Sequence, residues 1–162
     1  MGLDMYLYER TYCPNVWRND KKSLRTDITA NLYDYPEKKT RKKFKNVAYI
    51  YCRKGYWRKA NAIHQFILDR CRGDLDIEDC NGRDLYVSDV CLEELRDICE
   101  DLLELKGKAF RERAAQLLPT SAGFFWGSYE YDKWYRQDVK YTLKLIKSLD
   151  LAHCQYIYNA DW

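Results

Sequence analysis

The chain has 162 residues, a length typical of one domain that buries most of its apolar surface without a metal ion or a disulfide. Hydrophobic residues make up 46% and charged residues 33%, which is the balance of a globular protein in water. No apolar run reaches the roughly 18–20 residues of a membrane span, and the first residues lack a basic region followed by an apolar one. We therefore expect neither membrane insertion nor secretion.

Three segments have the composition of β-strands. Residues 3–10 alternate with a period of two, and residues 47–53 and 154–160 are rich in β-branched and aromatic side chains. Helical patterns separate them without regular strand–helix alternation. The sequence therefore predicts an α+β fold in one domain, residues 1–162, with a small antiparallel or mixed sheet that includes both terminal strands and is covered by three to four helices.

Residues 13–46 show no sustained period and are polar, so we expect a long irregular excursion and leave open a short strand or helix within it. Residues 1–72 carry 17 basic against 7 acidic side chains, or +10, and the rest of the chain carries −7. The extreme is the run 38–45, KKTRKKFK. We interpret this basic run as a solvated loop, and leave open that it contacts phosphate or attracts anions to a nearby pocket.

Four segments carry the 3.6-residue period of amphipathic helices: 56–71, 88–105, 108–118 and 129–149. Ser88 and Ser128 stand at natural N-cap positions of the second and fourth segments. The last segment places Tyr135, Val139 and Ile146 on one apolar face.

The chain has seven cysteines and two histidines. They form no C-x-x-C pair, and their spacing is not typical of a zinc site. We expect reduced thiols that pack in the core; Cys71, Cys91 and Cys99 lie on predicted apolar helix faces. We expect no metal and no cofactor.

Polar side chains interrupt two of these apolar faces. Asn61 and His64 lie on the inward arc of 56–71, and Asp138 lies on that of 129–149. A buried amide, imidazole or carboxylate is costly unless it is paired. These groups either satisfy one another in the core or line a wet pocket.

The segment 119–131 places Gly123 and Gly127 on either side of three bulky aromatic residues, just before a predicted helix. Free N–H groups at that helix start would attract a phosphate, and the aromatic rings would offer stacking surfaces to a base. The alternative is a structural loop whose aromatic side chains fill the core.

Tyrosines recur at i, i+2 spacing in the predicted strands: Tyr6 and Tyr8, Tyr49 and Tyr51, Tyr156 and Tyr158. If the strands are neighbours in register, one face of the sheet is a tyrosine layer. The phosphate-binding, dinucleotide-binding, nucleophile-elbow and zinc-protease motifs are all absent, so the sequence does not support kinase-like ATP chemistry.

Three separated motifs carry a resemblance: the opening MGLDMYL, YWRKANAIH at 56–64, and GFFWGSYEYDKWY at 123–135 after LLPT. Together they resemble a widespread family of small uncharacterised bacteriophage proteins. The resemblance implies expression in the cytoplasm of an infected bacterial host, and it supplies no catalytic residue.

A small phage protein in that setting binds and sequesters a host-made signalling nucleotide, degrades one, or binds a host protein or nucleic acid. Aromatic, amide and basic groups without a metal set favour the first class, a counter-defence protein that holds a cyclic nucleotide or an ADP-ribose-like molecule without chemistry. The expected partner is an anionic, base-containing small molecule. Neither a membrane nor, by preference, a nucleic acid is expected, and a homo-oligomer is left open.

The predicted binding residues come from the loop at 120–129, the segment at 56–64, the first strand and the last helix. They are Tyr6, Tyr56, Trp57, Arg58, Lys59, Asn61, His64, Thr120, Gly123, Phe125, Trp126, Gly127, Ser128, Tyr129 and Asp138. Of these, Trp126, Trp57 and Tyr56 would stack on the base, whereas Arg58, Lys59 and N–H groups near Ser128 would hold the phosphate.

Overall fold

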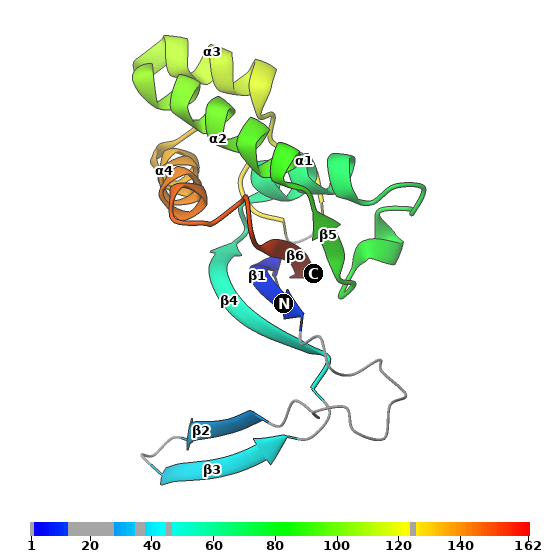
Figure 1. Cartoon of the computed structure of the whole chain (residues 1–162). Coiled ribbons are helices and arrows are strands. Elements are labelled where there is room, and N and C mark those ends of the chain that lie inside the picture. Colours follow the sequence, from blue (N-terminus) through cyan, green and yellow to red (C-terminus); the bar gives the residue numbers. More distant parts are fainter. Residues whose placement is uncertain (1, 13–27, 35–37, 45–46, 124–125) are drawn as a thin grey trace. The chain divides into compact units, whose positions relative to one another are not determined.

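The computed structural model describes residues 2–12, 28–34, 38–44, 47–123 and 126–162. The chain forms two compact units, one of Met1–Glu9 with Arg53–Trp162 and one of Arg10–Cys52 (Figure 1). The larger unit contains all helices of the described residues, and it holds the candidate site.

The larger unit is built on a four-stranded antiparallel sheet in the order β4-β1-β6-β5. The strands are β1 (Asp4–Tyr12), β4 (Tyr49–Arg58), β5 (Leu85–Val87) and β6 (Gln155–Asp161). Residues 10–12 of β1 and 49–52 of β4 are counted with the smaller unit. Both terminal strands belong to this sheet, as predicted. The three-residue strand β5, which pairs Tyr86 with Ile157 of β6, is too short for its pattern to stand out in the sequence.

Alternation along each strand separates a core face from an outer face. Met5 and Leu7 of β1 are fully buried, so Tyr6 and Tyr8 lie on the opposite face. Tyr156 and Tyr158 of β6, in contrast, are themselves core residues. The predicted layer that gathers the tyrosine pairs on one sheet face is therefore wrong, because the pairs differ in which face they occupy.

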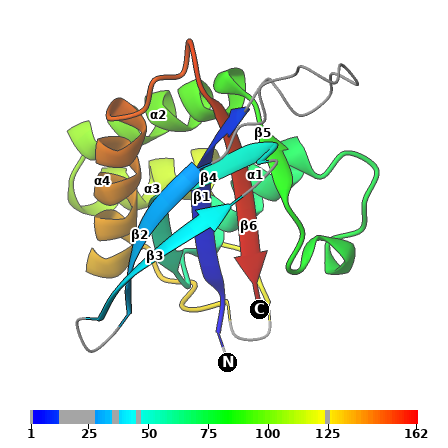
Figure 2. The same cartoon turned by 60° about the horizontal axis from the view of Figure 1, so that its bottom comes forward.

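Helices cover one face of the sheet (Figure 2). They are α1 (Asn61–Cys71), α2 (Asp89–Glu104), α3 (Gly107–Leu117) and α4 (Lys133–Lys147), with a short 3-10 turn, η1 (Glu78–Cys80). The Ser88 side chain accepts a hydrogen bond from the Cys91 N–H and caps α2 as predicted. Val139 and Ile146 of α4 are buried, which confirms the helical phase. No helix in the described ranges is long and apolar enough to cross a bilayer.

Two helix starts differ from the prediction. Residues 56–58 end β4 rather than opening a helix, because Trp57 packs beside Gly55 on the core face and Lys59 turns the backbone to φ 60°. The last helix begins at Lys133, and its N-cap is Asp132 rather than Ser128.

The smaller unit contains an antiparallel hairpin of β2 (Ile28–Asp34) and β3 (Lys38–Phe44), with Ile28 opposite Phe44. Most of the basic run is therefore a strand and not a loop. The physical reason is pairing: β2 satisfies the backbone of β3, whose composition alone does not favour a strand. Residues 13–27, 35–37 and 45–46 of the predicted irregular excursion lie outside the described residues.

Candidate functional site

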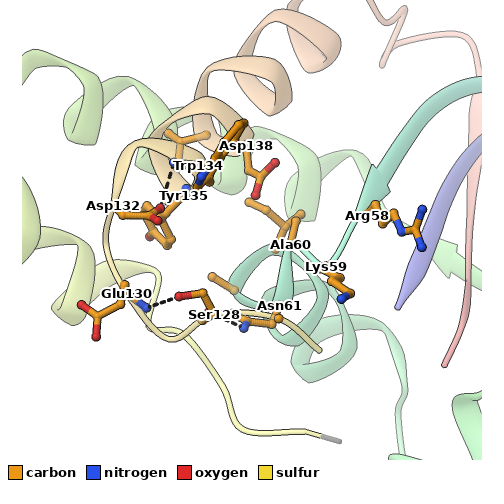
Figure 3. A pocket seen from close by; sticks show the side chains of 14 residues that line it. Arg58, Lys59, Ala60, Asn61, Ser128, Glu130, Asp132, Trp134, Tyr135 and Asp138 are labelled. Atoms are coloured by element: carbon orange, nitrogen blue, oxygen red, sulfur yellow. Dashed lines mark hydrogen bonds between the residues drawn. The ribbon is translucent and has the colours of Figure 1, made fainter. Parts of the chain in front are cut away.

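A cavity of about 310 Å³ opens where β4 leads into α1, beside the segment 127–132 and the first turns of α4 (Figure 3). Its lining residues come from three parts of the larger unit that are far apart in sequence. They are Arg58, Lys59, Ala60, Asn61, Ala62, Ile63, Gly127, Ser128, Glu130, Asp132, Trp134, Tyr135, Asp138 and Val139.

One wall of the cavity is a close contact between two backbones. Lys59 has φ 60°, unusual for a residue with a side chain, and its N–H donates to the Leu3 carbonyl at 2.8 Å. Gly127 has φ 110°, and a Cβ at that position would lie 2.7 Å from the Lys59 carbonyl oxygen. The absence of a side chain at Gly127 therefore allows the backbone of Lys59 to pack directly against it, and this wall of the cavity depends on both residues.

The opposite wall is acidic. Asp132 Oδ1 accepts hydrogen bonds from the Trp134 and Tyr135 N–H groups at 2.8 and 3.0 Å, so this carboxylate caps α4. One turn further along, Asp138 is partly buried, and burial raises its pKa to about 6, with a smaller contribution from Asp132. Within the described part of the chain Asp138 forms no hydrogen bond and no ion pair. Its carboxyl oxygens can therefore accept hydrogen bonds from a molecule in the cavity.

The basic residues lie at the edge of the cavity. Arg58 is well exposed, its Nε lies 4.0 Å from Asp4 Oδ1, and its side chain points away from the acidic wall (Figure 3). Lys59 lies between Arg58 and Asn61 in the same view. The cavity therefore has an acidic interior and a basic rim.

Two further side chains shape the interior. Asn61 is 3% exposed, and its Nδ2 donates to the Ser128 carbonyl at 2.9 Å, which ties α1 to the loop before α4. Trp134 is 62% exposed at the cavity and offers an aromatic surface. The sequence analysis missed Trp134 because this residue lies outside the apolar face of α4. The available signal was a tryptophan on the polar side of a predicted helix, close in sequence to Asp138.

Of the fifteen predicted binding residues, the structure brings six together at the cavity. They are Arg58, Lys59, Asn61, Gly127, Ser128 and Asp138. Asn61 and Asp138, selected because they interrupt apolar helix faces, are among them. Phe125 lies outside the described residues.

Three predicted residues pack in the core instead. Trp57 is 3% exposed and its Nε1 donates to Thr142 Oγ1 at 2.8 Å. His64 and Trp126 lie edge to face, with ring centroids 4.6 Å apart, and Trp162 packs against both. None of the three lines the cavity.

His64 is the most deeply buried polar group among them. Its Nδ1 is hydrogen-bonded to the Tyr158 hydroxyl at 2.6 Å, and burial lowers its pKa to about 3. Its Nε2 is buried and has no partner among the residues that are described. The imidazole is therefore neutral at physiological pH.

The remaining predicted residues lie outside the cavity lining. The Tyr56 hydroxyl donates to Asp4, and its ring centroid is 5.3 Å from that of Tyr6. Thr120 Oγ1 donates to the Tyr129 carbonyl at 3.1 Å, which closes the loop on itself. Gly123 packs directly against the Trp126 ring.

The predicted phosphate site at a helix N-terminus near Ser128 is wrong. The helix starts at Lys133, and its first N–H groups already bind the Asp132 carboxylate. An internal anion thus occupies the place that the sequence pattern assigned to a ligand phosphate.

No family model, curated protein or solved structure matches this chain. Among the residues described, no group of three or more His, Cys, Asp or Glu side chains is placed to hold a metal ion.

Proposed function

We propose that the cavity binds a small nucleotide-like molecule and holds it without chemistry. The observation that carries this proposal is Asp138, a partly buried carboxyl group in the cavity that no described residue pairs. Solvent reaches this carboxyl group, so a ligand with hydrogen-bond donors would replace water there. Ribose hydroxyls and exocyclic base amines are such donors.

The distribution of charge orients the ligand. An anionic group is disfavoured beside Asp132 and Asp138 and is favoured at the rim, where Arg58 and Lys59 supply positive charge. The exposed ring of Trp134 supplies a stacking surface, a contact worth roughly 1–3 kcal/mol per base. A nucleotide would thus place its sugar or base donors inward and its phosphate outward.

The biological role that we propose rests on the resemblance to bacteriophage proteins. In it, the protein acts in the cytoplasm of the infected bacterium and sequesters a host-made signalling nucleotide, such as a cyclic nucleotide or an ADP-ribose-like molecule. Sequestration requires affinity alone, which agrees with a cavity that carries binding groups.

A specific observation favours one alternative, a nucleotide-degrading enzyme. A cavity carboxyl group with a pKa of about 6 has the property of a general acid or base. In that case Asp138 would transfer a proton during cleavage rather than accept a lasting hydrogen bond. The two functions differ in the fate of the ligand.

The proposal is tested by thermal shift with 3′,5′-cyclic AMP, cyclic di-GMP, ADP-ribose and AMP, with inorganic phosphate as the anion control. We expect at least one nucleotide to raise the melting temperature beyond phosphate, because a ligand of the folded state stabilises it by mass action. Trp134→Ala should reduce that shift, whereas Tyr86→Ala, an exposed aromatic on β5, should not.

Recovery of the nucleotide after denaturing the complex then separates the functions. Intact ligand supports sequestration, and a cleaved product supports the enzyme. Shifts that are equal for phosphate and for every nucleotide, together with no small molecule in native mass spectra of protein purified from cells, would contradict both.

A further inference from the structure

Two thiols meet where α1 ends and α2 begins. Cys71 is the last residue of α1, Cys91 lies in the first turn of α2, and their Sγ atoms are 3.9 Å apart. Cys91 is 4% exposed, whereas Cys71 is partly exposed. No other two thiols in the described ranges are in such contact. We propose that Cys71 and Cys91 form a redox-active pair that a hydroperoxide converts into a disulfide.

The surroundings of Cys71 favour its thiolate. The thiols of Cys71 and Cys91 are within hydrogen-bond distance of each other, Arg70 is adjacent, and the Ser88 backbone at the start of α2 provides a further hydrogen bond. The hydrogen bond with Cys91 lowers the pKa of Cys71 most, and the other two groups act in the same direction against burial. The bidentate pair of Arg70 with Glu94, at 2.5 and 2.7 Å, fixes the guanidinium beside the thiol.

Cys91 is the complementary partner. Its hydrogen bond to Cys71 and its burial both raise the pKa of its thiol, so it keeps its proton while Cys71 reacts. The accessible, thiolate-forming cysteine and the buried, protonated one thus have different tasks. Cys71 is suited to attack an oxidant, and Cys91 is suited to resolve the product.

The chemistry balances in two steps. The Cys71 thiolate attacks the distal oxygen of a hydroperoxide, the O–O bond breaks, and an alkoxide or hydroxide leaves and takes up a proton, which gives Cys71 sulfenic acid. Cys91 sulfur then attacks Cys71 Sγ; the S–S bond forms, the S–O bond breaks, and the hydroxide leaves with the Cys91 proton as water. Two thiols lose two electrons, and the peroxide is reduced to an alcohol, or to water, and a second water.

Formation of the disulfide requires the two sulfur atoms, 3.9 Å apart, to move closer. A disulfide has an S–S length of about 2.05 Å, so the sulfurs must approach by roughly 2 Å. Cys71 is the terminal residue of its helix, where rotation of the side chain disturbs no further turn. The bond would join the end of α1 to the start of α2 and close residues 72–90 into a loop.

The test is peptide mapping of the full chain after treatment with hydrogen peroxide at low protein concentration, followed by alkylation of the remaining thiols. We expect a Cys71–Cys91 disulfide to accumulate before the exposed Cys52 is oxidised, and to disappear with dithiothreitol. Cys80→Ser serves as the matched control and should keep the disulfide.

Single variants separate the two tasks. In Cys91→Ser, dimedone should trap sulfenic acid on Cys71, and in Cys71→Ser, Cys91 should remain reduced; circular dichroism verifies that each variant is folded. Oxidation of Cys52 while Cys71 and Cys91 stay reduced would overturn the proposal. So would a disulfide that joins either cysteine to a different thiol in preference.

Discussion

At the scale of single residues, burial has moved two titratable groups in opposite directions. The pKa of Asp138 is raised to about 6, and that of His64 is lowered to about 3, because in each case burial disfavours the charged form. The same physical cause has different consequences: Asp138 lines a cavity that solvent can enter, whereas His64 is enclosed by Tyr158, Trp126 and Trp162.

Asp138→Asn should stabilise the ligand-free protein at neutral pH. The folded-state pKa of Asp138 lies above the value of 3.8 for a free side chain, so the stability it contributes is complete below that value and is lost as the pH rises through about 6. The difference between these two pKa values corresponds to at most about 3 kcal/mol, and solvent at the partly exposed carboxyl group reduces this amount. Urea unfolding of Asp138→Asn and of the natural protein should give free energies of unfolding whose difference increases as the pH rises from about 4 to about 7.

The matched control for that series is Asp74→Asn, at an exposed loop position. It removes an exposed carboxyl group, and the difference in unfolding free energy that it causes is the reference for Asp138→Asn. If the two asparagine variants behave alike, then the partial burial of Asp138 has no energetic consequence and the argument from its raised pKa fails.

The ring of His64 should stay neutral well below the ordinary histidine pKa. Its folded-state pKa of about 3 lies below the unfolded value of 6.5, so the stability it contributes is present above that value and is lost as the pH falls toward 3. Nuclear magnetic resonance of the imidazole should therefore show no shift of the His64 signals between about pH 8 and pH 5. His153→Gln identifies the signals of the second histidine; a His64 titration near 6.5 would show that the ring is not enclosed as described.

At the scale of elements, the Asp132 carboxylate caps the start of α4 beside the cavity. Asp132→Ala should cost about 1 kcal/mol of stability, because it leaves the N–H groups of Trp134 and Tyr135 without their acceptor. Asp132→Asn should largely keep the cap. Ser128→Ala should leave stability within about 0.5 kcal/mol, and a larger loss for Ser128 than for Asp132, measured by urea unfolding, would restore the start that the sequence pattern suggested.

The phase of α4 gives a second prediction. Ile146 is 2% exposed, so Ile146→Asp would bury a charge with no partner and should cost several kcal/mol. Lys140→Asp, on the exposed side of the same helix, should cost far less. Equal melting temperatures for the two variants would contradict the packing of α4.

The sequence was most informative where one short-range pattern governs the structure. The apolar faces of α2 and α4 and the terminal strands follow from periodicity, and Asn61 and Asp138 were identified because they interrupt such faces. Helix starts were less predictable, since Ser128 and Asp132 are both good caps and only tertiary packing selects between them.

Long-range pairing accounts for the other differences. The basic residues of β3 form a strand because β2 pairs with them, which no local pattern reveals. Trp126 and His64 look like ligand-binding groups in the sequence, yet they pack against Trp162, which is distant in the chain. A polar or aromatic residue that interrupts a local pattern can pack in the core or line a cavity, and its sequence neighbours do not distinguish the two.

At the scale of the whole molecule, α1 connects the two sites that we propose. Its first residue, Asn61, lines the cavity, and its last residue, Cys71, contacts Cys91. Asn61 and Cys71 are separated by about 15 Å along the helix axis. The sites occupy opposite ends of one rigid element, so each can be tested with the other left intact.

The disulfide should be visible in global stability. Closing residues 72–90 into a loop restricts the unfolded chain and should raise the free energy of unfolding by about 3 kcal/mol. Urea unfolding of the oxidised and reduced protein measures this difference, with Cys91→Ser as the control that should show none. An oxidised protein that is less stable than the reduced one would mean that the bond strains the junction of α1 and α2.

The central claim, that Asp138 receives donors from a bound nucleotide, is tested most directly by calorimetric titration. The titrant is the nucleotide that gives the largest thermal shift, and the proteins are the natural chain, Asp138→Asn and Tyr86→Ala. We expect Asp138→Asn to bind about 10–100-fold more weakly at about pH 7.5, the effect of losing a hydrogen bond to a charged group. The natural chain should also lose affinity at about pH 5, where Asp138 is mostly protonated, and Tyr86→Ala should match it at both pH values. Equal affinity of Asp138→Asn and the natural chain at both pH values would contradict the account.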